Sequence, residues 1–273
     1  MNHHYLFISA HLDDAVISCG DYIYGLVQHG SKVTIATVFT GMGSELSMLA
    51  RIIHKKFGLG ADTMGVRRLE DIRAAEALGA SVLHLGLLEC IYRKNKDGSP
   101  VYGKLHNLFD TDWRNEAGVL EEIVKVMTEQ IGFNRYDAVF VPLGIGRHVD
   151  HRLVREAAEQ ARLRSGFHAQ IDFMYYEDLP YLCYKRDISW QSELAGGLHA
   201  RNVLLTRNGL KAKIHAVLHY RSQIGLLWPS KYGMLKMLAG HARSKRENES
   251  GSYWMTLYAS GAGDPVPHFG SVK

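Results

Sequence analysis

Short apolar segments alternate with amphipathic segments along the first two thirds of this chain, and this alternation limits the fold more than any other feature. Continuous apolar runs bounded by polar residues are typical of parallel strands that are buried on both faces. The sequence has such runs at residues 5–10, 33–39, 81–88, 137–143 and 170–176. Helical periodicity occurs at residues 15–29, 67–78, 117–131 and 153–163. This order predicts an α/β fold, a Rossmann-like open parallel sheet with helices on both faces.

The last third of the chain is less regular. Residues 211–224 have helical periodicity, and residues 261–273 resemble a frayed tail. The polar stretch at 91–115 predicts a long loop, and loops of that length are usually functional or mobile. We therefore expect a single domain over 1–273, with a core at about 5–180 and a helical or irregular part at about 181–273.

Composition argues against several classes of protein. The net charge of +4 is small for 273 residues and does not indicate a nucleic-acid partner. No apolar stretch approaches the length of a membrane span, and the start lacks the pattern of a signal peptide. Three widely spaced cysteines without a CxxC motif favour a reducing cytoplasm. The expected partner is a small molecule, and a homo-oligomer stays open.

Polar, titratable residues follow the first apolar run at once, in the segment His11-Leu12-Asp13-Asp14. Ligands of open parallel sheets bind at the carboxyl ends of the strands, so these side chains are where a site is expected. Histidine and aspartate are both zinc ligands, and aspartate can also act as a general base. The competing interpretation is structural, with an aspartate that caps the next helix and an ordinary loop histidine.

A second such segment, His148-Val149-Asp150-His151, follows the fourth apolar run. Its two histidines are about 60° apart around a helix, so both rings can face one point. Asp150 is placed to orient a histidine, as carboxylates behind metal ligands do. A solvated, histidine-rich helix start is the alternative. Because both segments follow predicted strands, we expect them to build the metal site of a hydrolase.

The combination of segments resembles a known family. Ala10 to Ala15 reads AHLDDA, and Pro142 is followed by the spacing x5-His148-x-Asp150-His151. Further matching pieces are Thr40-Gly41, Arg67-x-x-Glu70, the segment 175–181 (YYEDLPY), and Lys213 with His219-x3-Gln223. In this order they resemble the LmbE-like or PIG-L-like N-acetylglucosaminyl deacetylases. Leu12 departs from the family, in which proline is usual.

The resemblance implies a zinc-dependent hydrolase, with Fe²⁺ or Co²⁺ as alternative metals. The implied metal ligands are His11, Asp14 and His151. Three protein ligands leave a position open for water, as catalytic zinc sites do. The implied reaction removes an acetyl group from an N-acetylated amino sugar, and a metal-bound water attacks the amide carbonyl.

The resemblance also implies the catalytic roles. Asp13 would be the general base, and a protonated His148 would stabilise the oxyanion while Asp150 tunes it. Arg67 and Tyr176 are candidates for substrate contact. For Arg67 the alternative is a surface ion pair with an acid of its own helix, and for Tyr176 it is a core position, because neighbouring strand residues point to opposite sides.

The sequence leaves the substrate's aglycone open. Candidates are an aminoglycoside or glycopeptide antibiotic precursor, a thiol precursor, a chito-oligosaccharide and a sugar lipid. The HLDD variant and the 91–115 loop favour a natural-product precursor. An amidase acting on a low-molecular-weight thiol-sugar conjugate and a non-catalytic sugar-binding module are the alternative functions. A dinucleotide-binding protein is disfavoured because residues 11–20 contain no GxGxxG motif.

Overall fold

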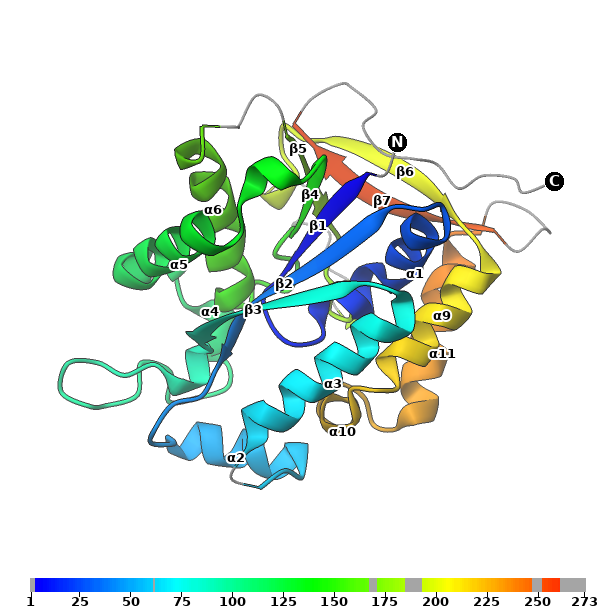
Figure 1. The fold of residues 1–273 in the computed structure, drawn as a ribbon. Helices are drawn as coiled ribbons and strands as arrows, with labels where there is room; N and C mark the ends of the chain where they lie inside the picture. The colour runs from blue at the N-terminus through cyan, green and yellow to red at the C-terminus, as the bar shows by residue number, and fades with distance from the viewer. Residues whose placement is uncertain (1–2, 61, 167–170, 185–192, 247–251, 261–273) are drawn as a thin grey trace.

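Seven strands form one sheet in the order β3-β2-β1-β4-β5-β7-β6 (Figure 1). The computed structural model describes residues 3–60, 62–166, 171–184, 193–246 and 252–260. The strands are β1 (His4–Ser9), β2 (Lys32–Gly41), β3 (Ser81–Leu88), β4 (Ala138–Pro142), β5 (Asp172–Tyr176), β6 (His199–Leu205) and β7 (Tyr253–Ala259). The first five are parallel, which confirms the predicted α/β class, and β7 is antiparallel to both of its neighbours.

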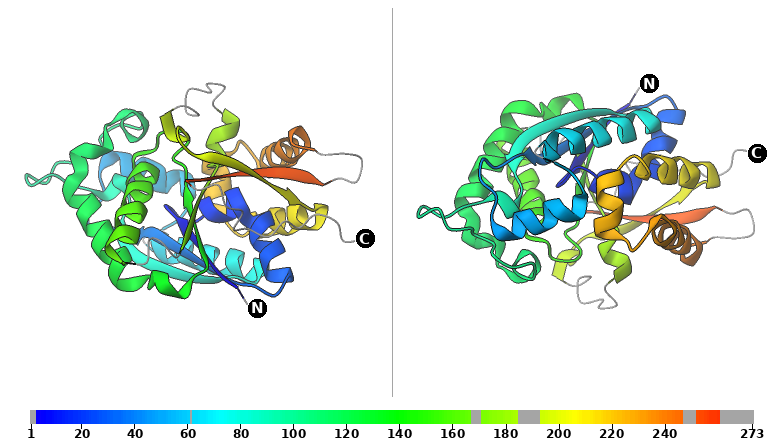
Figure 2. Two further views of the ribbon diagram at one scale, coloured as in Figure 1. Left: turned by 90° about the horizontal axis from the view of Figure 1, so that it is seen from above. Right: turned by 90° about the horizontal axis from the view of Figure 1, so that it is seen from below.

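Helices cover both faces of this sheet. The longer ones are α1 (Asp14–Gln28), α2 (Met48–Phe57), α3 (Thr63–Leu78), α5 (Ala117–Gln130), α6 (Val149–Arg164), α9 (Arg207–Val217), α10 (Arg221–Leu227) and α11 (Lys231–Ser244). Figures 1 and 2 show α5 and α6 on one side and α1, α3, α9 and α11 on the other. None of the helices in the described ranges is both long and apolar enough to cross a membrane.

Alternating side chains of the strands supply two separate cores. On β1, Leu6 and Ile8 pack into the core beneath α5 and α6, while Tyr5 and Phe7 pack into the core beneath α1. This follows from the two-residue period of a strand. Both faces of β1 are thus apolar, which is why the run appears continuous in the sequence.

The C-terminal third differs most from the sequence prediction. The expected helix at 211–224 is two helices, α9 and α10, and α11 and the strands β6 and β7 were not predicted. The edge strand β6 is largely exposed over its first half, so it lacks the continuous apolar run used to find the other strands. The expected tail at 261–273 lies outside the described residues.

The predicted loop at 91–115 is partly ordered. It contains the short helix α4 (Asn107–Asp110) and starts a 3₁₀ turn at Trp113–Glu116. Tyr102 and Leu108 from this segment are buried. The segment is therefore part of the packed protein, although its composition is that of a loop.

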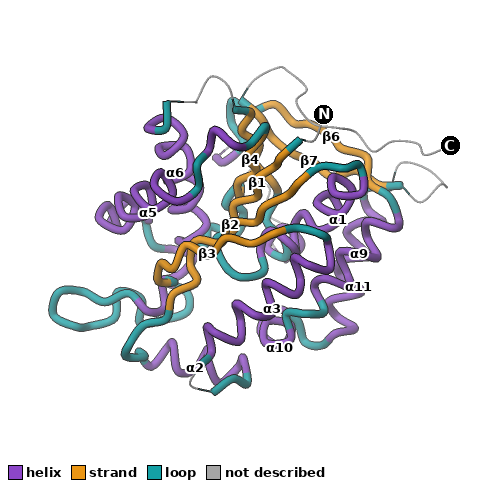
Figure 3. The backbone as a smooth tube through the Cα atoms, viewed as in Figure 1, coloured by secondary structure: helices purple, strands orange, loops and turns teal. Residues whose placement is uncertain are grey.

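The strand order places the two polar segments side by side. The chain leaves β1 toward β2 on one side, and β4 pairs with β1 on the other, so the order reverses between these two strands (Figure 3). Such a reversal opens a crevice at the carboxyl ends of the strands. The segment 11–14 follows β1 and the segment 148–151 follows β4, so both lie at this crevice.

The stacked rings of Phe7 and Phe140 offer a test of the core. Their centroids are 4.3 Å apart with an interplanar angle of 7°, and both side chains are fully buried. We expect Phe140→Ala to lower the free energy of unfolding in urea by about 3–5 kcal/mol, because it removes buried surface and leaves a cavity. Leu163→Ala, at a position that is 57% exposed, should change it by less than about 0.5 kcal/mol. Equal losses in both variants would contradict this description of the core.

Candidate active site

The turn after β1 is built by hydrogen bonds that leave one carboxylate free. Ser9 Oγ accepts the N–H of Ala15 (3.1 Å) and donates to the carbonyl of His11 (2.7 Å). Asp14 Oδ2 accepts the N–H of His11 (2.7 Å). Asp13 occupies the position before α1, but its side chain makes no capping bond. The interpretation of Asp13 as a helix cap therefore does not hold.

The turn after β4 requires glycine. Gly144 and Gly146 have φ values of 89° and 91°, in the region that glycine adopts without strain. A Cβ on Gly146 would lie 2.7 Å from the Cβ of Tyr181. The chain then enters α6 at Val149, four residues earlier than expected, so His151 lies in the first turn of the helix.

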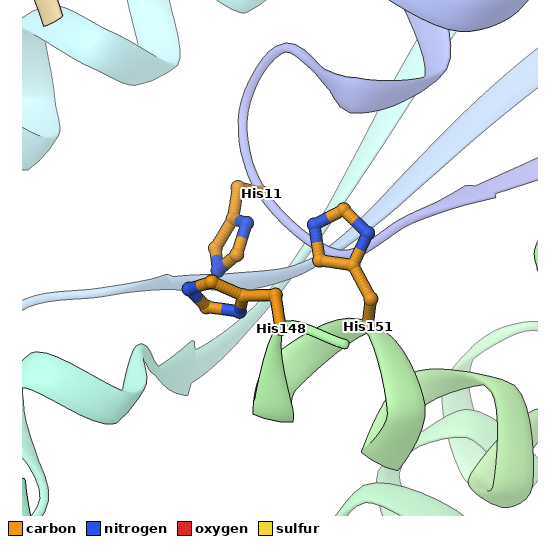
Figure 4. A group of neighbouring side chains, drawn as sticks. All are labelled: His11, His148 and His151. Carbon is orange, nitrogen blue, oxygen red and sulfur yellow. The ribbon is translucent and has the colours of Figure 1, made fainter. Parts of the chain in front are cut away.

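Two histidine rings face each other across a shared carboxylate. His11 Nδ1 and His151 Nε2 each lie 3.3 Å from Asp14 Oδ2. The other ring nitrogens are held from behind, since His11 Nε2 is 2.9 Å from Asp150 Oδ2 and His151 Nδ1 is 2.7 Å from Asp178 Oδ1. Figure 4 shows the rings of His11 and His151 turned toward the space between them. Metal-binding histidines are held by outer carboxylates in the same way.

The donor atoms fit a divalent cation. His11, His148 and His151 each offer a ring nitrogen within 4.8 Å of the others. His151 Nε2 is buried and has no hydrogen-bond partner, although it points toward Asp14. Imidazole nitrogen and carboxylate oxygen together suit zinc and similar metals. The expected ligands His11, Asp14 and His151 thus lie together in a geometry that can hold such an ion.

A second group of donors is less suitable. Cys90, His148 and Asp150 also lie close together. Burial raises the pKa of the Cys90 thiol well above its usual value, which disfavours the thiolate form that binds metals. The carboxylate of Asp150 already pairs with Arg93, whose Nη2 is 2.5 Å from its Oδ1. The rings of His11 and His151, with Asp14 between them, are therefore the better candidate for a metal site.

The charges around the two rings favour a cation. Burial alone would lower the pKa of His151, but Asp14 and Asp178 raise it to about 10. Burial likewise opposes a charge on His11, yet the hydrogen bonds with Asp14 and Asp150 raise its pKa well above the usual value. The carboxylates thus favour positive charge at both rings, and a divalent cation between the rings would supply it.

Asp13 is a buried acid with an unusual pKa. It is 5% exposed, and burial, with Asp14 beside it, raises its pKa to about 7. Within the described part of the chain, its carboxylate has no hydrogen bond to another side chain. A group that titrates near neutral pH can both accept and return a proton. A cation bound beside it would lower this pKa.

The surroundings of His148 disfavour the imidazolium that the resemblance implies. Burial and the nearby His11 lower its pKa to about 3. Its Nδ1 accepts the N–H of Asp150 (3.3 Å), which assigns the ring hydrogen to Nε2. The ring lines the cavity between Phe109 and Tyr181. His148 can therefore donate a hydrogen bond there without a charge.

Asp150 also has a different partner from the one expected. Its carboxylate contacts His11, Arg93 and the backbone N–H of Cys90 (3.0 Å), and only its own N–H contacts His148. The Asp150 carboxylate lies behind the His11 ring, and Asp150 does not line the cavity.

A cavity of about 580 Å³ opens over these groups. Arg67 lies in its wall, is 3% exposed, forms an ion pair with Glu89 and stacks over the ring of Phe57. The alternative of a surface ion pair for Arg67 is therefore wrong. The acids on its own helix have other partners, since Glu70 binds Ser222.

The structure corrects the placement of Tyr176. This residue is fully buried, and its hydroxyl donates to the carbonyl of Ile8 (2.9 Å). It does not line the cavity. Tyr175, on the other face of β5, donates to Glu159. Tyr181, which follows the strand, is the tyrosine in the cavity wall.

Two residues that hold the site were given no role in the prediction from sequence. Asp178 contacts His151 and also accepts the N–H groups of Gly144 and Ile145 (2.7 and 2.8 Å). Asp178 follows β5, so the expectation that ligands bind at the carboxyl ends of strands could have identified it. Arg93 bridges Asp150 and Glu116 from within the predicted loop, and no pattern in the sequence indicates it.

Comparison with known proteins agrees with this geometry. The model of the family described as "PIG-L: GlcNAc-PI de-N-acetylase" matches residues 6–162, which include both polar segments. The chain belongs to this family. It is a hydrolytic N-deacetylase, and the matched range includes both segments that line the cavity.

Several relatives carry more specific names. The chain is 30% identical to the 2′-N-acetylparomamine deacetylase of Niallia circulans over 81% of this chain and 80% of that protein. The zinc-inhibited form of teicoplanin deacetylase Orf2 is 30% identical, with a TM-score of 0.80 over 93% of this chain and 97% of that one. The A40926 pseudoaglycone deacetylase Dbv21 is 31% identical, with a TM-score of 0.71 over 95% and 97%.

Arg93 offers a test of how the site is held. Arg93→Met keeps most of the side chain's volume but leaves the carboxylates of Asp150 and Glu116 buried without their cation. We expect it to lower the free energy of unfolding by about 3–5 kcal/mol. Metal affinity should fall by about 10- to 100-fold, because Asp150 no longer fixes His11. Urea unfolding and competition with a chelator measure the two effects.

Arg114→Met is the matched control from the same segment. Arg114 is exposed and pairs with Asp112 at the surface, so its loss should change stability by less than about 1 kcal/mol and leave metal affinity as in the wild type. An Arg93→Met protein with wild-type metal affinity would contradict the positioning role.

Proposed function

We propose that this enzyme removes the acetyl group from an N-acetylated amino sugar and releases acetate. The observation that carries the proposal is the position of Asp13 in the cavity wall beside His11 and Asp14, with His151 buried behind Asp14. Among the described residues, no other side chain hydrogen-bonds the carboxylate of Asp13. The names of the relatives support it, because one acts on an N-acetylated aminoglycoside and another on teicoplanin.

The proposed metal ligands are His11 Nδ1, Asp14 Oδ2 and His151 Nε2, and the proposed metal is zinc, with Fe²⁺ or Co²⁺ as alternatives. The 3.3 Å distances from both ring nitrogens to Asp14 Oδ2, and the His151 nitrogen without a hydrogen-bond partner, support this set. When bound, such a cation supplies Lewis acidity at the acetyl oxygen and lowers the pKa of water to about 7.

Asp13 is the proposed general base. Its carboxylate lies in the cavity wall, and no side-chain bond among the described residues holds it in another direction. It takes the proton of the water that attacks the acetyl carbon, and it then returns this proton to the leaving amine.

His148 is the proposed oxyanion donor. With Nδ1 occupied by the N–H of Asp150, its Nε2–H is free to donate to the acetyl oxygen as negative charge develops there. Because the ring is neutral, it does not repel a cation held by His11 and His151. Asp150 and Asp178 act behind the ligands and touch no reacting atom.

The alternatives are less well supported. A sugar-binding module needs no buried, unengaged carboxylate beside a metal cluster. An amidase for a thiol-sugar conjugate would use the same groups, but the relatives named above are deacetylases by name. We also propose a cytoplasmic location, because Cys19, Cys90 and Cys183 are all free.

The role of Asp13 is tested by Asp13→Asn. Acetate release from an N-acetylated glucosaminide should fall by about 10²- to 10⁴-fold in kcat, because the amide cannot accept the proton. Metal content should stay at the wild-type level, since Asp13 is not a proposed ligand. Asp172→Asn, at an exposed position on β5, is the control and should keep full turnover. If Asp13→Asn retains wild-type kcat, the base is another group.

A further inference from the structure

The mouth of the active-site cavity is apolar, although the proposed reaction takes place on a sugar. Three separate segments form it: α2, residues 103–109, and α10. Their apolar side chains in the cavity wall are Met48, Leu49, Ile52, Ile53, Phe57, Leu105, Leu108, Phe109, Leu226 and Leu227. Figure 1 shows α2 beside α10, and the two helices are in contact. We call this set the apolar mouth.

Several of these side chains are left in water. Met48 is 74% exposed, Ile52 is 50% exposed and Leu105 is 54% exposed, and they come from two segments far apart in sequence. Scattered exposed apolar residues are normal, but a group of them around one cavity marks a binding surface. The exposed members of the apolar mouth are not needed to complete the fold, since its buried members Leu49 and Ile53 already belong to the core beneath them.

The charge of the mouth is of one sign. No acidic residue occurs in α2, in residues 103–109 or in α10, whereas Lys56 and Lys104 line the cavity. The acids of the cavity are deeper: Asp13 and Asp14 on the floor, and Glu89 paired with Arg67. A ligand portion with several ammonium groups would meet lysines and apolar side chains there, and would lose hydration without gaining a counter-charge.

The volume of the cavity also exceeds what one sugar needs. A volume of about 580 Å³ is within the range of roughly 300–1,000 Å³ that encloses whole drug-sized ligands. The polar floor can hydrogen-bond the acetamide and the ring hydroxyls of the sugar. The rest of the cavity, under the apolar mouth, has room for a second part of the substrate.

Building on the proposed deacetylase function, we infer that the substrate's amino sugar is attached to an apolar aglycone, aliphatic or aromatic, that is neutral or anionic and lies in the apolar mouth. The inference selects glycopeptide-like or lipid-like glycosides from the candidates and sets aside polycationic aminoglycosides. It makes Ile52, Leu105 and Leu226 specificity-determining residues.

A substrate panel tests this. Acetate release is measured for N-acetylglucosamine, its octyl glycoside below the micellar concentration, its phenyl glycoside, and 2′-N-acetylparomamine. Each methylene that leaves water should raise kcat/KM by about two- to fourfold, so the octyl glycoside should exceed the free sugar by at least about 30-fold. The phenyl glycoside should also exceed the free sugar, and 2′-N-acetylparomamine should be below both glycosides.

Variants of the mouth connect the preference to the structure. Ile52→Asn and Leu105→Asn should each lower the ratio of kcat/KM for the octyl glycoside over the free sugar by about three- to tenfold. Both positions are exposed, so the fold should tolerate the change. Leu163→Asn is the matched control, because Leu163 is 57% exposed and does not line the cavity, and it should keep the wild-type ratio.

The outcomes separate the two proposals. Equal kcat/KM for the free sugar and the octyl glycoside, or a preference for 2′-N-acetylparomamine, would overturn the inference and leave the deacetylase function intact. No acetate from any arm of the panel would overturn the proposed function itself.

Discussion

Two histidine rings, each held between carboxylates, are the constraint on which this site depends. Asp14 lies between the rings, and Asp150 and Asp178 hold them from the outside. Burial alone would keep both rings neutral, and the carboxylates reverse this. The excess of negative charge in a dry pocket is unfavourable unless cations balance it. Arg93 pairs with Asp150 behind His11. A divalent metal fits between the two rings, beside Asp14.

The sheet supplies the geometry for this arrangement. The reversal of strand order between β1 and β4 brings segments about 137 positions apart to one crevice, and β5 adds Asp178 from the next strand. The apolar mouth above belongs to other segments, α2, residues 103–109 and α10. The proposed catalytic groups thus lie at rigid strand ends, whereas the proposed recognition groups lie on surrounding segments. The recognition segments can therefore vary with the aglycone while the chemistry is retained.

Local patterns explain what the sequence could predict. Leu6, Phe7 and Ile8 form a strand buried on both faces, so the central sheet was readable, and polar residues directly after strands marked the site. Long-range contacts explain the rest. The neutral state of His148 depends on burial by Phe109 and Tyr181, and the role of Arg93 depends on a segment whose composition indicates only a loop. Tyr176 was misplaced because both faces of β5 pack into a core, so neither Tyr175 nor Tyr176 reaches the cavity.

Metal content is the most direct test of the central claim. Elemental analysis of the purified chain should find about one divalent ion per chain, as expected for a site with three protein ligands. His151→Gln should lose the ion, whereas His215→Gln, at an exposed position on α9, should keep it. A wild-type chain without a stoichiometric divalent metal after incubation with zinc, or a His151→Gln protein that retains it, would contradict the account.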